Sequence, residues 1–599
     1  MSAEIATVRK PRRNRRIVWI VVGSLIAILL FVGVWVAVRG SMARTELLGA
    51  IPLAHKIETA AVSGNTAGTA ADVRRLQQRA AHAEALTSDP VWRAAEIIPV
   101  VGRNLAAVRQ SAALVREVSV AGIPPLVTLA TTINLHQLVP HDGAFNLALF
   151  AKAEPSLSAS RSAFDAARVH AAKISAAGTI DQVGSAVRKL VGLVDQTAGA
   201  VDGIDTAAKL LPTMLGSAGP RNYLLLSLNS SELRTPGGIP GAIAVVNATD
   251  GRLTLDQRTS ATALGHAASP VLPLSAAEKT LYDERLGTYM QNVVSTPNFE
   301  RSGELAQAMW KLKTGQTVDG VVAIDPVALG YILKATGPVS VGSGVTLNST
   351  NAATFLLSTV YAQIPDTTLQ DKFFAGATRQ IFAVMTRGSL NSTKLVDALS
   401  RSASENRIHI WSAHPDEERE LSNSTLAGGL PISTKAATAF GVYFNDATGA
   451  KMDFYLRSAI TVSSAVCRAD KRPNFDVAVD LTLKAPLDAA TSLPTYVTGR
   501  YAFGVKPGRV RTNVYVYAPA GAQPFSVLVN GKEYAFVSAE LDGHPVVGAV
   551  VEMGPGDTDS LKFRFVGKAG NATSVSLQHT PMSSTVRTSV TGKVDCGKL

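Results

Sequence analysis

Two cysteines in 599 residues exclude a disulfide-dense scaffold and a cysteine-rich zinc module. Charged residues are scarce at 17%, while 46% of the residues are hydrophobic, and this balance excludes an intrinsically disordered chain. Long apolar runs are nearly absent as well. A single segment is apolar enough to span a bilayer, so the chain is not a polytopic membrane protein. The length exceeds that of one ordinary core and predicts two or three domains.

The formal net charge is +12, and its distribution along the chain decides what it means. Residues 1–16 contain six basic groups and one glutamate, which gives +5, and the remaining residues contain 52 basic and 45 acidic groups, which gives +7. A basic tail before a mildly basic body is typical of a membrane protein rather than of a protein that binds nucleic acid. We therefore expect a membrane partner and no nucleic acid.

The apolar segment at residues 17–38 contains no charged residue and ends at Arg39. At about 1.5 Å per residue it forms roughly 33 Å of helix, enough to cross a ~30 Å hydrocarbon core. Trp19 and Trp35 lie near its two ends, where indole rings prefer the interface. The basic tail predicts a single-pass type II protein in the cell membrane, with the N-terminus cytoplasmic and the bulk of the chain extracytoplasmic. The alternative is a cleaved signal peptide, with Ser41-Met42-Ala43 as its cleavage site.

Small apolar residues recur at helical spacing through residues 45–215, as in Val73, Leu76 and Ala80. Such stripes suit close packing of helices in a bundle or stalk. Pro124, Pro125 and Pro155 are expected to break this region into several helices. The region carries no pattern of catalytic residues, so we interpret it as a spacer.

From residue 216 onward the pattern changes. Short buried strands at Tyr223–Leu228 and Val318–Ile324 alternate with helical stretches, which is typical of an α/β domain. After about residue 440 apolar and polar residues alternate, as in Phe475–Leu483, which predicts an antiparallel β-sandwich. We therefore expect an α+β multidomain chain with a basic tail at 1–16, a transmembrane helix at 17–38, a helical stalk or bundle at 45–215, a central α/β domain at 216–439 and a β-sandwich at 440–599.

Export from the cytoplasm changes what the two cysteines imply. Cys467 and Cys596 can pair in an oxidising compartment, and their bridge would close a loop of about 130 residues. The two cysteines bracket the β-rich region. The alternative is a pair of buried free thiols, and we favour the bridge.

The densest group of polar residues follows the strand at Tyr223–Leu228. Asn229, Glu232 and Arg234 come directly after this strand and are followed by three glycines. Ligands of open α/β sheets bind at the carboxyl ends of strands. An arginine there can bind phosphate or carboxylate through two hydrogen bonds, and glycines let backbone N–H groups approach an anion. The alternative is a tight loop whose Asn and Glu cap the local backbone.

Four stretches of the central region resemble the bacterial family called domain of unknown function 4012. They are Arg221–Gly241, Tyr289–Phe299, Val318–Leu329 and Ala335–Val339. Upstream, Asp89–Trp92 and Ile98–Asn104 resemble the actinobacterial members of this family. The resemblance spans most of residues 85–460, and the family name implies no activity.

The order of features is also distantly similar to that of the LytR-CpsA-Psr transferases, which move glycopolymers from polyprenyl pyrophosphate onto peptidoglycan. This resemblance implies an external LytR-CpsA-Psr-like α/β domain. Together with the polar group after the strand, it gives a set of candidate phosphate or pyrophosphate ligands: Arg221, Asn229, Glu232, Arg234, Arg258, Arg379 and Gln380. A transferase of this kind would use a cation such as Mg²⁺ to neutralise developing charge. Asn229 stands where those enzymes have an acidic residue, so no metal ligands are assigned.

We expect an extracytoplasmic cell-envelope protein that binds polyprenyl-phosphate-linked envelope glycan or a cell-wall polymer. If it is an enzyme, the resemblance implies a glycopolymer phosphotransferase, with catalytic residues unassigned. The alternative is a non-catalytic envelope scaffold. An apolar groove with Arg234, Arg258 or Arg379 converging at its mouth would favour the first hypothesis, and a filled domain with these arginines apart would favour the second.

Two further groups of residues have ordinary structural explanations. His409, His414 and Glu417 lie close together in sequence but lack the spacing of a zinc-binding motif, so a polar surface loop is the better interpretation. Asp557 and Asp559 lie in a Pro-Gly-Asp-Thr-Asp-Ser segment, which is typical of a β-turn.

Overall fold

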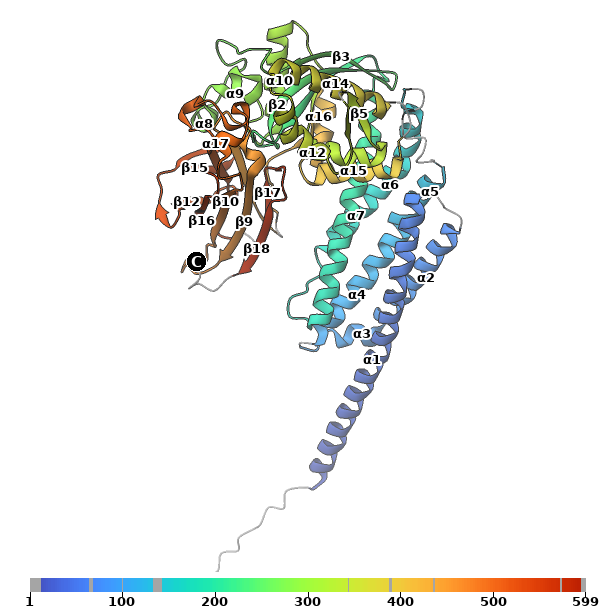
Figure 1. Ribbon diagram of the computed structural model, residues 1–599. Coiled ribbons are helices and arrows are strands. Elements are labelled where there is room, and N and C mark those ends of the chain that lie inside the picture. Colours follow the sequence, from blue (N-terminus) through green and yellow to red (C-terminus); the bar gives the residue numbers. More distant parts are fainter. Residues whose placement is uncertain are drawn as a thin grey trace, which may run out of the picture. The chain divides into compact units, whose positions relative to one another are not determined.

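The computed structural model describes residues 12–63, 68–99, 101–132, 140, 143–342, 344–386, 390–434, 437–570 and 574–593. The chain forms two compact units. Met1–Leu135 and Ala151–Lys209 make the first, here called the helical unit, and His136–Phe150 and Leu210–Leu599 make the second, here called the sheet unit. The expected α+β class is confirmed by the N-terminal apolar helix, the further helices and several sheets (Figure 1).

The helical unit is built on α1, a single helix of 52 residues that contains the whole apolar segment. Buried alanines such as Ala80, Ala83 and Ala112 let the helices approach closely. Pro155 lies inside α6, so the expected break is wrong: a proline costs one helical hydrogen bond, which packing of a 25-residue helix offsets. The elements are α1 (Arg12–Ser63), α2 (Thr69–Thr87), α3 (Pro90–Ala95), α4 (Val101–Glu117), the π-helical turn η1 (Val118–Gly122), α5 (Ile123–Thr132), α6 (Leu147–Ala171) and α7 (Asp181–Met214).

The first part of the sheet unit is a five-stranded sheet in the order β3-β2-β1-β4-β7. Its strands are β1 (Arg221–Asn229), β2 (Ile239–Thr249), β3 (Arg252–Ser260), β4 (Gly320–Ile324) and β7 (Ile408–Ser412). The central strands β1 and β4 are parallel, and the other pairs are antiparallel. Leu224, Leu226 and Leu228 of β1 are buried, as the apolar run Tyr223–Leu228 predicts.

Helices and a small hairpin surround this sheet. They are α8 (Ala276–Tyr282), α9 (Arg285–Thr288), η3 (Met290–Asn292), α10 (Phe299–Thr314), α11 (Pro326–Thr336), β5 (Val339–Gly342), β6 (Val345–Leu347), α12 (Ala352–Thr354), η4 (Phe355–Thr359), α13 (Val360–Gln363), α14 (Thr367–Thr386), α15 (Ser392–Ser404), α16 (Pro415–Leu421) and η5 (Thr425–Ala427). Asp325 caps α11 by accepting a 2.7 Å hydrogen bond from the Ala328 N–H, and Pro326 occupies the first helical position.

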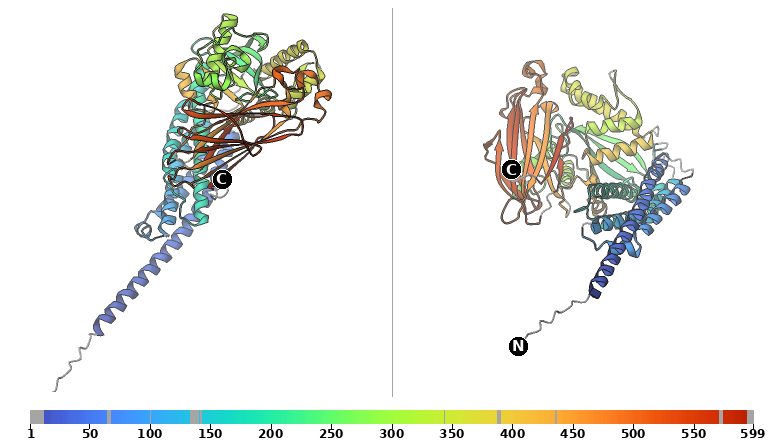
Figure 2. Two further views of the ribbon diagram at one scale, coloured as in Figure 1. Left: turned by 90° about the vertical axis from the view of Figure 1, so that its left-hand side faces the viewer. Right: turned by 90° about the horizontal axis from the view of Figure 1, so that it is seen from below.

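The second part of the sheet unit consists of two larger sheets that face each other (Figure 2). One has the order β13-β12-β16-β10-β9-β18 and the other the order β14-β15-β11-β8-β17. The expectation of wholly antiparallel sheets is wrong, because the last two strands of the chain pair parallel to their neighbours, β17 to β8 and β18 to β9. The elements are β8 (Thr438–Asp446), η6 (Met452–Tyr455), β9 (Leu456–Ala465), β10 (Asn474–Leu483), α17 (Ala489–Ser492), α18 (Thr495–Thr498), η7 (Ala502–Gly504), β11 (Val510–Tyr517), β12 (Gln523–Val529), β13 (Lys532–Glu533), β14 (Val537–Leu541), β15 (His544–Met553), β16 (Thr558–Val566), β17 (Val575–His579) and β18 (Arg587–Lys593).

The five-stranded sheet and the sandwich share their hydrophobic cores. One core joins Leu333 and Val339 to Phe440 and Phe475 of the sandwich. A second joins Leu224 and other residues of the five-stranded sheet to Tyr443 and Tyr517. Since two of the cores contain residues of both parts, the junction between them is packed like an interior.

Candidate functional site

Strand β1 separates the predicted ligands rather than gathering them. Arg221 is its first residue and Asn229 is its last. At about 3.3 Å per residue the two lie roughly 26 Å apart, at opposite edges of the sheet. One phosphate group cannot contact both side chains.

At the beginning of β1, Arg221 belongs to a cluster of charged residues. Its guanidinium lies 3.4 Å from Asp319 Oδ1 and 3.4 Å from Glu417 Oε1, and it contacts the ring of His414. The His414 Nε2 atom lies 2.9 Å from the same Asp319 oxygen. Arg221 therefore holds the start of β1 against the segment that follows β7.

At the carboxyl end of β1, the side chain of Asn229 is engaged within the protein. Its Nδ2 donates a 2.8 Å hydrogen bond to the Tyr361 hydroxyl, and its Oδ1 accepts a 3.0 Å hydrogen bond from the Ser231 N–H. The Ser231 hydroxyl in turn donates to the Leu357 carbonyl at 2.6 Å. These bonds fasten the loop between β1 and β2, residues 230–238 and here called the β1–β2 loop, to η4 and α13.

Arg234 is the centre of the β1–β2 loop. Its guanidinium makes four hydrogen bonds: two to Asn292 Oδ1, at 2.8 and 3.2 Å, one to the Leu233 carbonyl at 2.8 Å and one to the Asp446 carbonyl at 3.0 Å. It thereby ties the loop to η3 and to the end of strand β8. The fork that could bind a phosphate binds the protein instead.

The two glycines of this loop, Gly237 and Gly238, allow its backbone to fold tightly. Gly237 has φ 116°, a conformation that favours glycine. A Cβ atom on Gly238 would lie 2.4 Å from the Asn229 carbonyl carbon. The Gly237 N–H donates to the Arg234 carbonyl at 2.9 Å, and the Ile239 N–H donates to the Glu232 carbonyl at 2.9 Å. These two N–H groups therefore close the loop on itself.

Glu232 pairs with Lys451, a residue that no sequence pattern singles out. Both side chains are largely buried, with exposed fractions of 17% for Glu232 and 7% for Lys451. The ammonium also lies 5.1 Å from the ring centre of Tyr361 and 4.9 Å from that of Tyr496. Burial alone would lower the pKa of Lys451, but Glu232, Tyr361 and Tyr496 together outweigh this effect and the pKa is raised. Burial raises the pKa of Tyr361 to about 12.

Two further buried carboxyl groups complete the surroundings of the loop. Asp453 Oδ2 accepts a 2.7 Å hydrogen bond from the Leu233 N–H. Asp446 accepts 3.0 Å hydrogen bonds from the N–H groups of Thr448 and Gly449. Burial raises the pKa of Asp446 to about 6, against the opposing effect of Arg234, and burial together with Asp446 raises the pKa of Asp453. No local pattern marks these groups, because they lie over 200 residues after the loop.

The remaining predicted ligands lie on the surface. Arg258 is exposed on the edge strand β3, and Arg379 and Gln380 are exposed on α14. Within the described part of the chain, no hydrogen bond or ion pair joins these three side chains to another residue. Of the seven predicted ligands, the structure brings together Asn229, Glu232 and Arg234 only.

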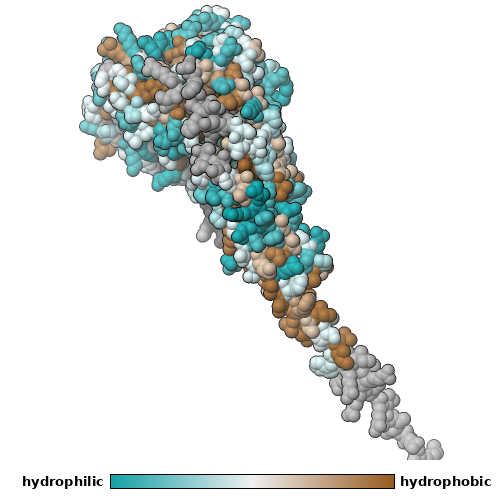
Figure 3. Space-filling model, turned by 90° about the vertical axis from the view of Figure 1, so that its right-hand side faces the viewer, coloured by the Kyte–Doolittle hydropathy of each residue, from teal (hydrophilic) through white to brown (hydrophobic). Residues whose placement is uncertain are grey.

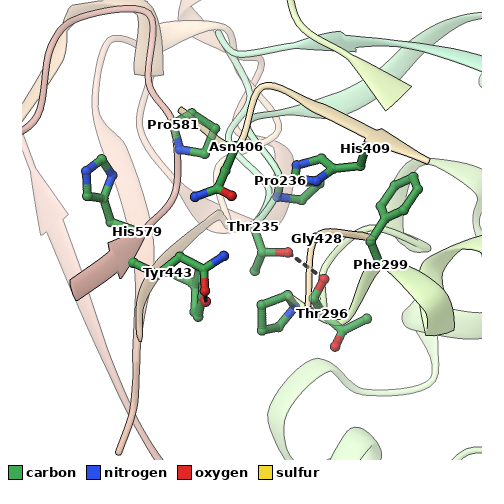
Figure 4. Close-up of a pocket in the computed structure, with 12 residues that line it drawn as sticks. Thr235, Pro236, Thr296, Phe299, Asn406, His409, Gly428, Tyr443, His579 and Pro581 are labelled. Atoms are coloured by element: carbon green, nitrogen blue, oxygen red, sulfur yellow. Dashed lines mark hydrogen bonds between the residues drawn. The ribbon is translucent and has the colours of Figure 1, made fainter. Parts of the chain in front are cut away.

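The junction between the five-stranded sheet and the sandwich contains a small cavity of about 10 Å³ (Figure 4). Its lining includes Thr235, whose hydroxyl donates to the Thr296 carbonyl at 2.6 Å, and His409. His409 is 3% exposed, and burial lowers its pKa to about 4, so its ring is neutral at pH 7. The cavity has room for about one water molecule.

A second hollow, of about 400 Å³, lies on the surface between α11, β6 and α15. Lys334, Lys394 and Asp397 are exposed around it. Among the described residues, histidine, cysteine, aspartate and glutamate side chains form no group of three placed to hold a metal ion. Cys467 is disulfide-bonded, and its predicted partner Cys596 lies outside the described residues.

Comparison with known proteins gives a family match for part of the chain. Residues 218–361 match the family model described as "Protein of unknown function (DUF4012)". This range contains β1, the β1–β2 loop, Asn292 and Tyr361. No curated protein is significantly similar to the chain. The similarity to LytR-CpsA-Psr transferases and the actinobacterial origin stay predictions.

A search of solved structures matches a protein of Legionella pneumophila that is provisionally named a nutrient binding protein. The match has 10% sequence identity and a TM-score of 0.14, and it covers 22% of this chain and 43% of that protein. The aligned part is therefore less than half of the other protein. A TM-score this low establishes neither a shared fold nor a shared function.

Proposed function

We propose that this protein is a non-catalytic scaffold of the cell envelope, anchored in the membrane by α1 and carrying the sheet unit outside the cytoplasm. The observation that carries the proposal is the engagement of Arg234. Its four hydrogen bonds all go to the protein, and Asn229 and Glu232 are likewise engaged with Tyr361 and Lys451. The group of residues best suited to bind pyrophosphate serves to join the five-stranded sheet to the sandwich.

The exposed surface of α1 supports membrane anchoring. Trp19 is 71% exposed, Phe31 59% and Val34 64%. By length and composition two helical stretches of the described residues could cross a membrane, Trp19–Ile57 and Val101–Thr132, where the sequence predicts one. We assign the anchor to the first, the more apolar of the two, and Figure 3 shows hydrophobic residues along its projecting part. Apolar side chains on an isolated helix are stable only when lipid or protein covers them. A signal sequence has the same length and hydropathy, and retention of the N-terminus in the mature chain distinguishes an anchor from it.

Fractionation and proteolysis test the anchor. We expect the full-length chain to stay in the membrane fraction after carbonate washing and to keep its N-terminal tag. Protease added to intact cells stripped of their wall should digest the sheet unit and leave a short tagged fragment. A soluble chain that lacks residues 1–38 would overturn the anchor.

Genetic complementation tests the scaffold. In cells that lack the gene, we expect the double variant Arg258→Ala and Arg379→Ala to restore the wild-type ratio of wall-bound to released glycopolymer. The Arg234→Ala variant should complement less well than wild type only in proportion to the smaller amount of folded protein that accumulates. Transfer of labelled glycan from polyprenyl pyrophosphate to peptidoglycan by the purified full-length chain would overturn a non-catalytic function.

Binding of polyprenyl-phosphate-linked glycan or of an anionic wall polymer is the second candidate function. The observation that favours it is the pair Arg258 and Arg379, which are exposed and have no ion-pair partner among the described residues. In this case the double variant would accumulate at the wild-type level yet fail to complement. The same experiment therefore separates the two functions.

A further inference from the structure

The α3–α4 connection of the helical unit carries apolar side chains that point away from the protein. Ile97 is 83% exposed, Ile98 37% and Val101 47%. The turn between the two helices is short, and a Cβ atom on Gly102 would lie 1.9 Å from the Glu96 carbonyl oxygen, so the backbone of the turn is tightly folded. Here we call the described residues Glu96–Pro99 and Val101 the apolar turn.

The position of the apolar turn along α1 is fixed by contacts within the helical unit. Trp92 and Ala95 of α3 pack against Val32 and Val36 of α1. Asp89 accepts a 3.3 Å hydrogen bond from the indole N–H of Trp35. Figure 1 shows α3 beside α1, where the N-terminal part of α1 leaves the rest of the helical unit.

These contacts lie inside the apolar segment and not beyond it. Val32 and Val36 belong to the last two turns of residues 17–38, and Val32 precedes Arg39 by roughly 10 Å of helix. If α1 crosses the bilayer as proposed above, α3 packs on the part of α1 that lies in the outer leaflet. The apolar turn at the end of α3 then lies near the level of the outer leaflet.

The charges around the apolar turn fit this position. The Glu96 carboxylate is bound on both oxygens by Arg109, at 2.6 and 3.1 Å, and the Asp89 carboxylate lies 3.7 Å from Arg39. Arg93 and Arg103, which flank the turn, are exposed and have no ion-pair partner among the described residues. The acids near the turn are thus neutralised within the protein, and two cations remain free for lipid phosphates.

A second loop at the same end of the helical unit adds to the surface. The N–H of Ile180, at the start of α7, donates a 2.9 Å hydrogen bond to the Asn104 side chain in the first turn of α4. Ile180 is 55% exposed. The loop between α6 and α7 therefore presents a further apolar side chain beside the apolar turn.

We propose that the apolar turn is a second membrane contact, which inserts Ile97, Ile98 and Val101 into the outer leaflet of the bilayer that α1 crosses. Arg93 and Arg103 bind lipid phosphates at its rim. The contact rests on the proposed membrane anchoring. It holds the helical unit at a fixed orientation on the membrane, which a single helix cannot do.

Fluorescence of the full-length chain in phosphatidylcholine–phosphatidylglycerol vesicles tests this contact. An environment-sensitive NBD label is attached to Ile97→Cys, to Val34→Cys as the positive control and to Val120→Cys as the matched control. Val120 is 50% exposed but lies past the far end of α4, roughly 25 Å away. The unmodified chain, labelled in parallel, gives the background from its own two cysteines.

We expect lipids that carry a spin label high on the acyl chain to quench the probes at positions 97 and 34 severalfold and to leave the probe at position 120 unquenched. Unquenched, water-like emission at position 97 together with quenching at position 34 would overturn the membrane contact while leaving the anchor intact. Unquenched emission at both positions would overturn the anchor, and the contact with it. Arg93→Gln with Arg103→Gln should reduce quenching at position 97 more in vesicles that contain phosphatidylglycerol than in pure phosphatidylcholine.

Discussion

The guanidinium of Arg234 donates a 3.0 Å hydrogen bond to the main-chain carbonyl of Asp446, a residue 212 positions later in the chain. The bond joins the loop after the first strand of the five-stranded sheet to the last residue of the first sandwich strand. The Asp446 N–H returns a 2.9 Å hydrogen bond to the Leu233 carbonyl. Through these two hydrogen bonds the β1–β2 loop attaches the five-stranded sheet to the sandwich.

Replacing Arg234 by alanine should therefore destabilise the sheet unit. The change removes four hydrogen bonds from a charged donor and leaves Asn292 and two carbonyls without that partner. We expect a loss of roughly 2–3 kcal/mol, measured as a lower thermal midpoint of the purified chain. Arg258→Ala is the control, because that side chain is exposed and has no described partner, and it should change stability by less than about 0.5 kcal/mol. Equal effects of the two variants would contradict the fastening role.

The Glu232–Lys451 pair should show strong coupling. Both groups are largely buried, so removal of one leaves the other charge without compensation. We expect Glu232→Gln alone to cost roughly 3 kcal/mol, and the double variant with Lys451→Met to recover much of that loss. A double-mutant cycle of unfolding midpoints measures the coupling. Additive effects of the two single changes would show that Glu232 does not stabilise the buried Lys451 ammonium.

The sequence predicted the elements better than it predicted the site. The apolar run Tyr223–Leu228 lies within β1, and Val318–Ile324 contains β4, because a largely buried strand has a run of apolar residues that the sequence shows directly. The alternation at Phe475–Leu483 likewise lies within β10. Pro155 misled the prediction, since a proline within a long packed helix is tolerated.

The partners of the site residues could not be predicted from the sequence. Lys451 and Asp446 follow Glu232 and Arg234 by 219 and 212 positions, and no periodicity reports a pairing at that distance. A polar loop after a buried strand looks the same whether its side chains bind a ligand or another part of the chain. The contacts in the fold favour the second alternative that the sequence left open for the β1–β2 loop, a loop whose polar side chains bind the chain itself, and ligand binding by this loop stays a prediction.

The disulfide of Cys467 should join it to Cys596. Cys467 is disulfide-bonded, and the chain contains two cysteines in all. Peptide mapping under non-reducing conditions should recover the two cysteine-containing peptides as one species that dithiothreitol separates. Because the bridge closes a long loop, Cys596→Ser should cost roughly 2–4 kcal/mol. A chain that migrates as a disulfide-linked dimer, with no internal cross-linked peptide, would contradict the internal bridge.

The buried carboxyl groups beside the β1–β2 loop should make stability depend on pH in an unusual direction. Burial raises the pKa of Asp446 to about 6, above the value of about 4 for an unfolded aspartate. Between these values the folded chain binds more protons than the unfolded chain, so this group's contribution to stability is present below pH 4 and is lost as pH rises to 6. Most buried, salt-bridged carboxylates act in the opposite direction.

The contribution of Asp446 is isolated by comparing the pH dependence of stability in the wild type with that in Asp446→Asn. We expect wild-type stability relative to that of Asp446→Asn to fall by on the order of 2 kcal/mol between pH 4 and pH 6.5. Thermal midpoints of the two purified chains across this range measure it. Asp470→Asn is the control, because Asp470 pairs with Arg468 on the surface, a contact that lowers the pKa of Asp470; wild-type stability relative to this variant should not fall over the same range. A difference between wild type and Asp446→Asn that stays constant with pH would show that Asp446 remains ionised in the folded protein, with Arg234 overcoming the effect of burial.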